Sequence, residues 1–305
     1  MSDLVLGLDI GGSKTHAILA DGDAVLADVL AGSANPASVG LEEASRQLAA
    51  VFGRLGPVGI GAICAGVAGA DSDTGAERFR GLLSLHAPGV PVRVVHDSEL
   101  LLAAAEVDSG VAVISGTGSV AWGRNPGGEV TRVGGWGYLL GDEGSGYWVT
   151  RMAVRHALER VDLGEPADLL SQQLAADCGL QGPEGLLDHF YAQPERRYWA
   201  SRGRVVFELA ADQDPASSAI VSAAADALAD MAARVADRIG VVGPIVLAGG
   251  QAVHQPLLQE RVRQRLAARA ITDVRVLDED PVHGAVRLAR ALLATGTVGS
   301  RRPRA

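Results

Sequence analysis

The sequence predicts an α/β protein built from two similar α/β domains with a cleft between them. Short apolar runs that suit strands alternate with segments of helical periodicity along the 305 residues, which is typical of α/β architectures. Two stretches also begin alike, with a strand, a glycine turn and a second strand, at Leu4 and at Gly110. They are not a sequence repeat, but a duplicated domain would explain their similarity, and the length suits about two domains.

Each element is predicted from its local pattern. Apolar runs closed by glycine predict strands, and apolar residues spaced three or four apart predict helices. In the first half we expect strands at 4–10, 15–20, 24–30, 58–67 and 92–95, and helices at 41–52, 78–85 and 99–106. In the second half we expect strands at 110–115, 120–124, 130–133, 244–248 and 274–277, and helices at 145–160, 167–177, 204–211, 216–240, 256–268 and 283–294.

Composition and charge exclude several classes of protein. The chain is 48% hydrophobic and carries a net charge of −9, so we expect no nucleic-acid partner. Cys64 and Cys178 lie far apart, which argues against a disulfide framework or a CxxC metal site and favours the cytoplasm. The longest uncharged stretches, 55–70 and 109–123, are too short to span a membrane. We therefore expect a cytoplasmic protein with no membrane partner.

The first cluster of interest follows the first strand. Asp9 stands near the end of that strand, and a turn follows at Gly11, Gly12, Ser13 and Lys14. Glycine lets backbone N–H groups approach an anion, and a carboxylate beside bound phosphate suits a hydrated Mg²⁺. The turn is therefore a candidate nucleotide site with Asp9 as the metal residue, although an ordinary hairpin would look the same. Lys14 does not complete a P-loop, because GxxxxGK[ST] is absent.

Two later glycine turns are further candidates for the nucleotide. Gly116, Thr117 and Gly118 follow the strand at 110–115 and lead into Ser119. Their N–H groups and the Thr117 hydroxyl suit phosphate, whereas Ser119 is a candidate contact to a substrate. Gly249 and Gly250 follow the strand at 244–248, where a flat adenine ring could pack. Each turn taken alone could also be purely structural.

A glycine-rich loop between residues 134 and 146 predicts a sugar site. It holds six glycines in thirteen residues, which no core strand or helix requires. Trp136 can lie flat against a sugar ring, Asp142 or Glu143 can accept hydrogen bonds from sugar hydroxyls, and Gly135 and Gly137 flank the tryptophan. The alternative is a mobile surface loop.

Asp97 is the candidate catalytic base. It follows the strand at 92–95, and ligands of open α/β sheets bind at the carboxyl ends of strands. A carboxylate there could take the proton from an attacking hydroxyl, or it could simply cap the helix at 99–106. His96 reads as structural, and Asn35 in the loop 33–36 could contact a polar ligand or belong to a simple turn.

These motifs together resemble a known family. Along the chain they run DxGGS, SxN, GxAGAD, a strand-end Asp, SGTGS, GGWGxxxGDEGS and a late AGG. This order resembles the BadF/BadG/BcrA/BcrD-type ATPases, and among them most closely the N-acetylglucosamine kinases. The resemblance runs from Leu4 to about Ala294 and implies the actin/hexokinase-like ATPase fold. The sequence departs from the pattern at Val120, where such kinases carry Asn, and at Ser13, where Thr is commoner.

The resemblance also implies roles and domains. It implies ATP contacts at Gly11, Gly12, Ser13 and Thr117, adenosine near Gly249 and Gly250, and sugar contacts at Asn35, Asp97, Trp136, Gly137 and Asp142. Asp97 would be the general base and Asp9 an indirect Mg²⁺ ligand. The first domain is expected at 1–114, with the C-terminal segment 283–305 packing back on it, and the second at 115–282.

The expected reaction is transfer of the γ-phosphate of ATP to the 6-hydroxyl of an amino sugar, first of all N-acetylglucosamine. Three alternatives stay open from the sequence: a glucosamine kinase of the same family, a dehydratase-activator ATPase and a non-catalytic sugar sensor. The simplest oligomer would be a homodimer with twofold symmetry.

Overall fold

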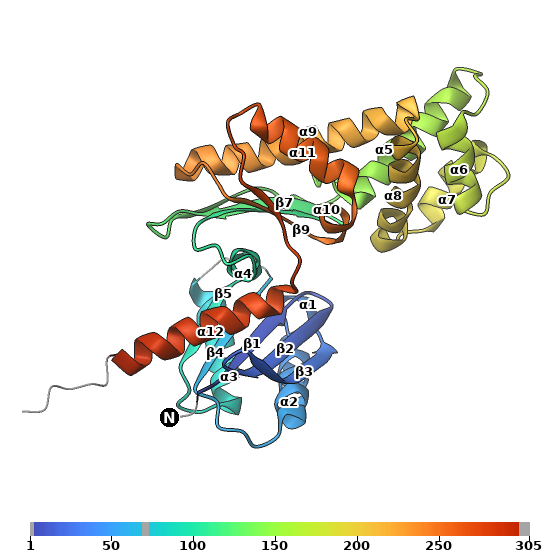
Figure 1. Ribbon diagram of the computed structural model, residues 1–305. Coiled ribbons are helices and arrows are strands. Elements are labelled where there is room, and N and C mark those ends of the chain that lie inside the picture. The colour runs from blue at the N-terminus through green and yellow to red at the C-terminus, as the bar shows by residue number, and fades with distance from the viewer. Residues whose placement is uncertain (1–2, 69–72, 299–305) are drawn as a thin grey trace, which may run out of the picture. The chain divides into compact units, whose positions relative to one another are not determined.

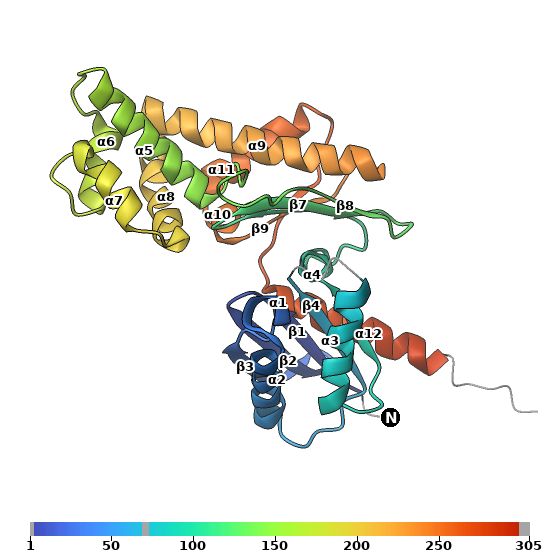
Figure 2. The ribbon, with the colours of Figure 1, turned by 180° about the vertical axis from the view of Figure 1, so that it is seen from behind.

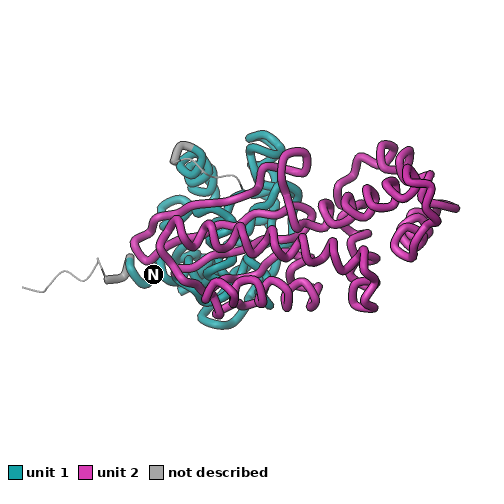
Figure 3. Tube along the Cα trace, turned by 90° about the horizontal axis from the view of Figure 1, so that it is seen from above, with its two compact units in different colours: residues 1–108, 277–305 teal, residues 109–276 magenta. Residues whose placement is uncertain are grey.

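The computed structural model describes residues 3–68 and 73–298, and its helices and strands form two compact units (Figure 1). Unit 1 comprises residues 1–108 and 277–305, and unit 2 comprises residues 109–276 (Figure 3). The observed boundaries, after residues 108 and 276, come a few residues earlier in the chain than those expected after 114 and 282. The reason for the difference at the first boundary is that the strand beginning at Gly110 pairs within the second sheet.

Unit 1 contains a five-stranded mixed sheet in the order β3-β2-β1-β4-β5. Its strands are β1 (Leu4–Ile10), β2 (Lys14–Asp21), β3 (Ala24–Gly32), β4 (Ala62–Val67) and β5 (Val92–His96). β2 is antiparallel to both β1 and β3, whereas β4 is parallel to both β1 and β5. The three parallel strands therefore end at one edge of the sheet.

Helices cover both faces of this sheet (Figures 1 and 2). They are α1 (Pro36–Val39), α2 (Leu41–Leu55), α3 (Asp73–His86), α4 (Asp97–Ala104) and α12 (Pro281–Val298). Because side chains alternate along a strand, β1 supplies Leu6 and Leu8 to the core under α2 and α3 and Val5 to the core under α4 and α12. The helix nearest the C-terminus thus packs on the first strand of the chain.

Unit 2 repeats the same topology. Its sheet has the order β10-β9-β6-β7-β8, with strands β6 (Gly110–Ser115), β7 (Ser119–Arg124), β8 (Val130–Gly134), β9 (Ile245–Ala248) and β10 (Val274–Val276). β7 is antiparallel to both β6 and β8, whereas β9 is parallel to both β6 and β10. β6 to β10 therefore correspond in order to β1 to β5, which confirms the predicted class of two similar α/β domains.

Unit 2 also carries a larger set of helices. They are α5 (Gly146–Asp162), α6 (Leu169–Asp177), the 3₁₀ turn η1 (Pro183–Gly185), α7 (Leu186–Ala192), α8 (Arg196–Ala211), α9 (Pro215–Ile239), α10 (Gly250–His254) and α11 (Pro256–Ala267). The long α9 packs on β6, β7 and β8, and α11 packs on α9. Trp199 of α8 is fully buried in the same core. No helix in the described ranges is long and apolar enough to span a membrane.

Several predicted elements differ from those observed. Residues 58–61, predicted as the start of a strand, precede β4 as irregular chain that contains Gly59 and Gly61. α8 begins at Arg196 rather than at 204, and the short helices α1, α7 and α10 were not expected. Helices of so few turns show too little periodicity to be read from a sequence.

Candidate functional site

Asp9 and Asp97 lie at the same edge of the unit 1 sheet. In the register of the parallel strands, Asp9 pairs with Gly66 of β4, and Val67 of β4 pairs with His96 of β5. Asp97 follows His96 directly as the first residue of α4. β4 lies between β1 and β5, so two strand spacings of about 4.8 Å each separate the positions of the two aspartates. Both stand at the edge of the sheet where open α/β sheets bind their ligands.

Asp97 does not cap its helix, which removes the structural alternative for this residue. α4 begins at Asp97 itself, two residues earlier than predicted, and His96 is the N-cap. The Nδ1 atom of His96 accepts a hydrogen bond of 3.2 Å from the backbone N–H of Ser98. His96 therefore has a structural role, as predicted. Its Nδ1 atom also lies 3.0 Å from Asp97 Oδ1, and the Asp97 carboxylate stays partly exposed.

The electrostatics of this edge centre on Asp9. Burial raises the pKa of the Asp9 carboxyl to about 6, and the negative charge of Asp97 is the next cause of that increase. Asp280 raises it further, whereas Lys14 and His16 oppose the shift. Ionisation of Asp9 is thus less favourable than that of a free aspartate, and a bound cation would stabilise the carboxylate.

Two glycines position α4 against the sheet. A Cβ on Gly66 of β4 would lie 2.3 Å from Leu100 Cδ1, and a Cβ on Gly284 of α12 would lie 2.1 Å from the Leu100 carbonyl oxygen. Only glycine allows this close approach from both sides of Leu100. Because Leu100 lies one turn after Asp97, the glycines fix the start of α4 and with it the catalytic candidate.

The turn after Asp9 is tied to the loop that carries Asn35. The backbone N–H of Gly11 donates to the carbonyl of Lys14 at 3.0 Å, which closes the turn. The Ser33 hydroxyl donates to the carbonyl of Gly11 at 2.8 Å, and the buried Thr15 hydroxyl accepts from the N–H of Ala34 at 2.9 Å. Ser33 and Thr15 were not among the predicted site residues. Ser33 begins the SxN motif in the loop after β3, and the only signal of Thr15 was a polar side chain within an apolar strand.

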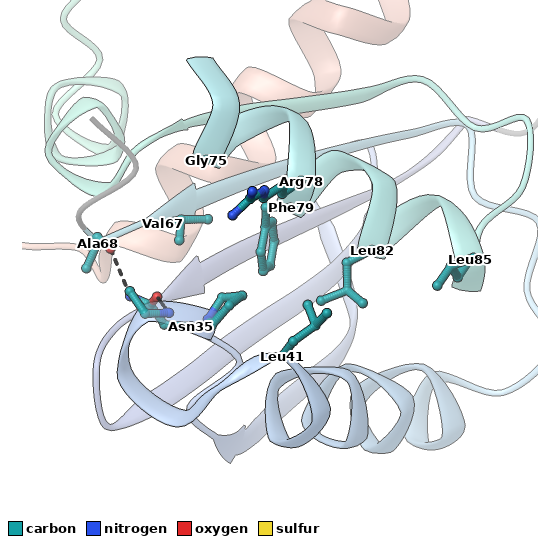
Figure 4. A pocket seen from close by; sticks show the side chains of 11 residues that line it. Asn35, Leu41, Val67, Ala68, Gly75, Arg78, Phe79, Leu82 and Leu85 are labelled. Atoms are coloured by element: carbon teal, nitrogen blue, oxygen red, sulfur yellow. Dashed lines mark hydrogen bonds between the residues drawn. The ribbon is translucent and has the colours of Figure 1, made fainter. Parts of the chain in front are cut away.

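Asn35 is buried and holds backbone rather than facing open solvent. Its side chain accepts from the N–H of Ala37 at 3.0 Å, so it caps α1. Its Nδ2 donates to the carbonyl of Ala68 at 2.8 Å (Figure 4). The loop position was predicted, but the contact with Ala68, a neighbour 33 positions away, could not be read from the sequence.

In unit 2, two of the predicted glycine turns lie side by side. β6 and β9 are parallel neighbours, with Ile114 opposite Ala248, so the turns after them share one edge. A Cβ on Gly116 would have the backbone N of Gly250 as its nearest neighbour, at 3.8 Å. A Cβ on Gly249, which has φ of +85°, would lie 2.6 Å from the Ser115 carbonyl oxygen. The close approach of the two turns therefore requires glycine at 249, whereas a Cβ at 116 would make only an ordinary contact.

Gln251 ties these turns to the glycine-rich loop. Its Nε2 donates to the carbonyl of Gly144 at 2.8 Å and to the Ser115 hydroxyl at 3.3 Å. The Ser115 hydroxyl donates to the same Gly144 carbonyl at 2.8 Å. Gln251 was not predicted as a site residue, because its neighbours lie more than 100 positions away in the sequence.

Asp142 also anchors the glycine-rich loop. It is buried and has φ of +60°, a conformation rare outside glycine. Burial raises the pKa of its carboxyl, while hydrogen bonds from the backbone N–H groups of Ser119 and Gly137 lower it. A Cβ on Gly118 would lie 2.8 Å from Asp142 Oδ2. The predicted residues Gly118, Ser119 and Asp142 are therefore in one cluster.

Trp136 is exposed on the same loop. Its side chain is 66% exposed, and the Arg132 guanidinium lies 5.4 Å from the ring centre. Gly134, Gly135 and Gly137 all have positive φ, which explains the number of glycines around the ring. A Cβ on Gly135 would lie 3.0 Å from a methyl group of Val120, so the residue that departs from the family pattern packs directly beneath this loop.

The predicted residues thus form two groups, one in each unit. Unit 1 holds Asp9, Gly11, Gly12, Ser13, Lys14, Asn35 and Asp97, and unit 2 holds Gly116, Thr117, Gly118, Ser119, Gly135, Trp136, Gly137, Asp142, Gly249 and Gly250. The last part of the GxAGAD motif, Gly69 to Asp71, lies outside the described residues. Within residues 3–68 and 73–298, no three His, Cys, Asp or Glu side chains are grouped so that they could hold a metal ion.

Comparisons with known proteins identify relatives along nearly the whole chain. A model of the BadF/BadG/BcrA/BcrD ATPase family matches residues 6–289. The chain is 35% identical over 230 residues to the N-acetylmuramic acid/N-acetylglucosamine kinase of Clostridium acetobutylicum, covering 72% of this chain and 75% of the relative. It is 28% identical over 313 residues to the N-acetyl-D-glucosamine kinase of Dictyostelium discoideum, covering 94% and 98% respectively.

Solved structures share the architecture at lower identity. A candidate N-acetylglucosamine kinase from Porphyromonas gingivalis has a TM-score of 0.73 at 22% identity, covering 94% of this chain and 99% of that one. The ROK hexokinase of Thermus thermophilus has a TM-score of 0.59 at 20% identity, covering 97% and 99%. These likenesses show the fold, and the predicted actin/hexokinase-like ATPase fold is confirmed.

Proposed function

Because the chain belongs to the BadF/BadG/BcrA/BcrD ATPase family, we propose that it is an ATP-dependent sugar kinase that phosphorylates the 6-hydroxyl of N-acetylglucosamine. Two relatives named for kinase activity on this sugar support the proposal. The observation that carries the chemistry is the pair Asp9 and Asp97 at one sheet edge, with Asp97 free of any capping role.

Asp97 is the proposed general base. A carboxylate within hydrogen-bond reach of the 6-hydroxyl would accept its proton as that oxygen attacks the γ-phosphorus, and the β–γ bridging oxygen would leave with ADP. The close packing of Gly66 and Gly284 around Leu100 holds the start of α4 in place. Such positioning accounts for a large part of catalysis in phosphoryl transfer.

Asp9 is the proposed carboxylate for Mg²⁺. Its environment fits a cation, because burial, Asp97 and Asp280 all raise its pKa. No cluster of three ligating side chains exists in the described ranges, so the ion would also depend on phosphate oxygens and water. When bound, Mg²⁺ would neutralise charge on the β- and γ-phosphates.

The glycine turns are the proposed nucleotide contacts. Gly11 and Gly116 would shape the two turns, because their N–H groups already donate to the carbonyls of Lys14 and Gly118. The N–H groups of Gly12 and Gly118, the Ser13 and Thr117 hydroxyls and the Lys14 ammonium would contact the phosphates. Gly249 and Gly250 would contact adenosine. The Thr117 hydroxyl suits this role, because it makes no hydrogen bond within the described part of the chain.

The sugar contacts are proposed at Asn35, Ser119, Gly135, Trp136, Gly137 and Asp142. Exposed Trp136 can pack on the apolar face of the pyranose. Asn35 and Asp142 already hold backbone groups, so they would act with their remaining lone pairs and protons and would fix the loops around the sugar.

An ADP-release screen tests the proposal. The sugars are glucose, glucosamine, N-acetylglucosamine and N-acetylmannosamine, each with ATP and Mg²⁺, and omission of Mg²⁺ is the control. We expect the highest kcat/KM for N-acetylglucosamine. A preference of tenfold or more for glucosamine would overturn the sugar assignment, and ADP release independent of every sugar would overturn the kinase assignment. A cytoplasmic homodimer remains a prediction, and light scattering of the purified protein tests the dimer.

A further inference from the structure

A large apolar cavity lies beside the proposed sugar residues of unit 1. Its volume is about 690 Å³, within the usual range of ligand pockets. It lies between α2 and α3 and is lined by Asn35, Pro36, Ala37, Leu41, Val67, Ala68, Gly75, Arg78, Phe79, Leu82 and Leu85 (Figure 4). Most of these side chains are aliphatic or aromatic, so the wall offers little to a sugar hydroxyl.

The cavity begins where the proposed acceptor site is. Asn35, a proposed sugar contact, and Ala68, whose carbonyl Asn35 binds, both line it. Val67 lines it as well and pairs with His96, the residue before Asp97. A sugar contacting Asn35 and Asp97 would therefore have the cavity open along one side.

Arg78 is the one charged residue among the described side chains that line the cavity. Figure 4 shows its guanidinium above the Phe79 ring, turned toward the side where Val67 and Asn35 lie. Neighbouring Arg80 on the same helix pairs with Glu77, but Arg78 has no ion pair or hydrogen bond within the described ranges. A guanidinium beside apolar walls is the arrangement that binds a carboxylate on a short hydrocarbon group.

We propose that this cavity is a subsite for a carboxylate-bearing substituent of the acceptor sugar and that Arg78 binds the carboxylate. The inference rests on the proposed function and extends it to acidic amino sugars. The hydrocarbon part of the substituent contacts Phe79 and Leu82, and the carboxylate accepts hydrogen bonds from the guanidinium. A neutral amino sugar leaves the cavity to water and does not use Arg78.

Two matched sugars test this subsite. N-Acetylmuramic acid differs from N-acetylglucosamine only by a carboxyethyl ether on O3, so the ratio of their kcat/KM values isolates the substituent. We expect the wild type to phosphorylate both. Arg78→Gln should lower kcat/KM for N-acetylmuramic acid about tenfold, through KM, because a hydrogen bond to a charged group is lost. Its kcat/KM for N-acetylglucosamine should stay within about twofold.

Arg80→Gln is the matched control, because Arg80 is on the same helix but does not line the cavity. It should leave both kcat/KM values unchanged. Arg78→Lys should lower kcat/KM for N-acetylmuramic acid less than Arg78→Gln does. The inference is overturned if Arg78→Gln leaves the ratio unchanged, or if the wild type phosphorylates N-acetylglucosamine but rejects N-acetylmuramic acid. If the wild type phosphorylates neither sugar, the proposed function fails as well.

Discussion

The negative charge of Asp97 is the largest cause, after burial, of the raised pKa of Asp9. The two carboxylates come from strands that are separated in the sheet by β4, and both end at the edge where ligands of open α/β sheets bind. This relationship couples the proposed base to the proposed metal residue, so removing the charge of Asp97 should lower the pKa of Asp9.

Asp97→Asn should separate catalysis from binding. We expect kcat to fall by roughly 10²–10⁴-fold, the usual contribution of a general base, while the fold and the affinity for ATP are kept. Asp108→Asn, at an exposed position of the same unit, is the control and should be fully active. Turnover close to that of the wild type would refute the assignment of Asp97.

Asp9→Asn should inactivate the enzyme and stabilise the free protein above about pH 6. The folded-state pKa of about 6 exceeds the ordinary value of 3.8, so the native state binds the proton more tightly and loses stability as pH rises between these values. Asn carries no charge, so at pH 8 the substitution should raise the free energy of unfolding by as much as about 3 kcal/mol.

Urea unfolding at pH 4 and at pH 8 without Mg²⁺ measures this effect. The increase in the free energy of unfolding of Asp9→Asn over the wild type should be near zero at pH 4 and present at pH 8. The control Asp21→Asn, at the end of β2, should show no increase that depends on pH. An equal gain at both values of pH would mean that the charge of Asp9 is not its cause.

Thr117→Val should raise the KM for ATP much more than the KM for sugar. Valine keeps the shape but removes the hydroxyl that is proposed to bind phosphate. Thr131→Val in β8 serves as the control, since Thr131 was not assigned to either ligand. Initial rates with one substrate varied at a time give both constants. A shift in the sugar KM alone would mean that Thr117 serves the sugar.

Gly284→Ala should destabilise unit 1 strongly. The new Cβ would lie 2.1 Å from the Leu100 carbonyl oxygen, so α12 or α4 must move, and overpacking of this kind costs about 1–3 kcal/mol or more. Gly81→Ala in α3, where a Cβ meets nothing within 4 Å, should instead be neutral or stabilising by about 0.5–1 kcal/mol. Thermal unfolding of both variants gives the comparison, and equal effects would contradict the account of packing around α4.

The fold class and the strand-end positions of several candidate residues were predictable because their signals are local. Strand patterns, glycine turns and strand-end aspartates are contained in windows of a few residues, and they placed Asp9, Asp97 and the turn at 116–118 correctly at strand ends. The start of α4 was not predictable to the residue, and the cap at His96 decides whether Asp97 is available.

What the sequence could not show depends on contacts between distant segments. Asn35 binds the carbonyl of Ala68, and Gln251 binds Gly144 and Ser115; none of these pairs is visible in a local pattern. The cavity beside Arg78 is equally invisible in a local pattern, because it forms only when α2 and α3 pack on the same sheet face. An arginine within an amphipathic helix looks like any other solvent-exposed charge.

The position of the transferred phosphate tests the central claim most directly. The purified protein is incubated with N-acetylglucosamine, ATP and Mg²⁺, and the product is examined by ³¹P–¹H correlation NMR. The account predicts coupling of the phosphorus to the two protons on C6, with product formation slowed roughly 10²–10⁴-fold in Asp97→Asn. Phosphate on the anomeric oxygen, or no sugar phosphate at all, would contradict it.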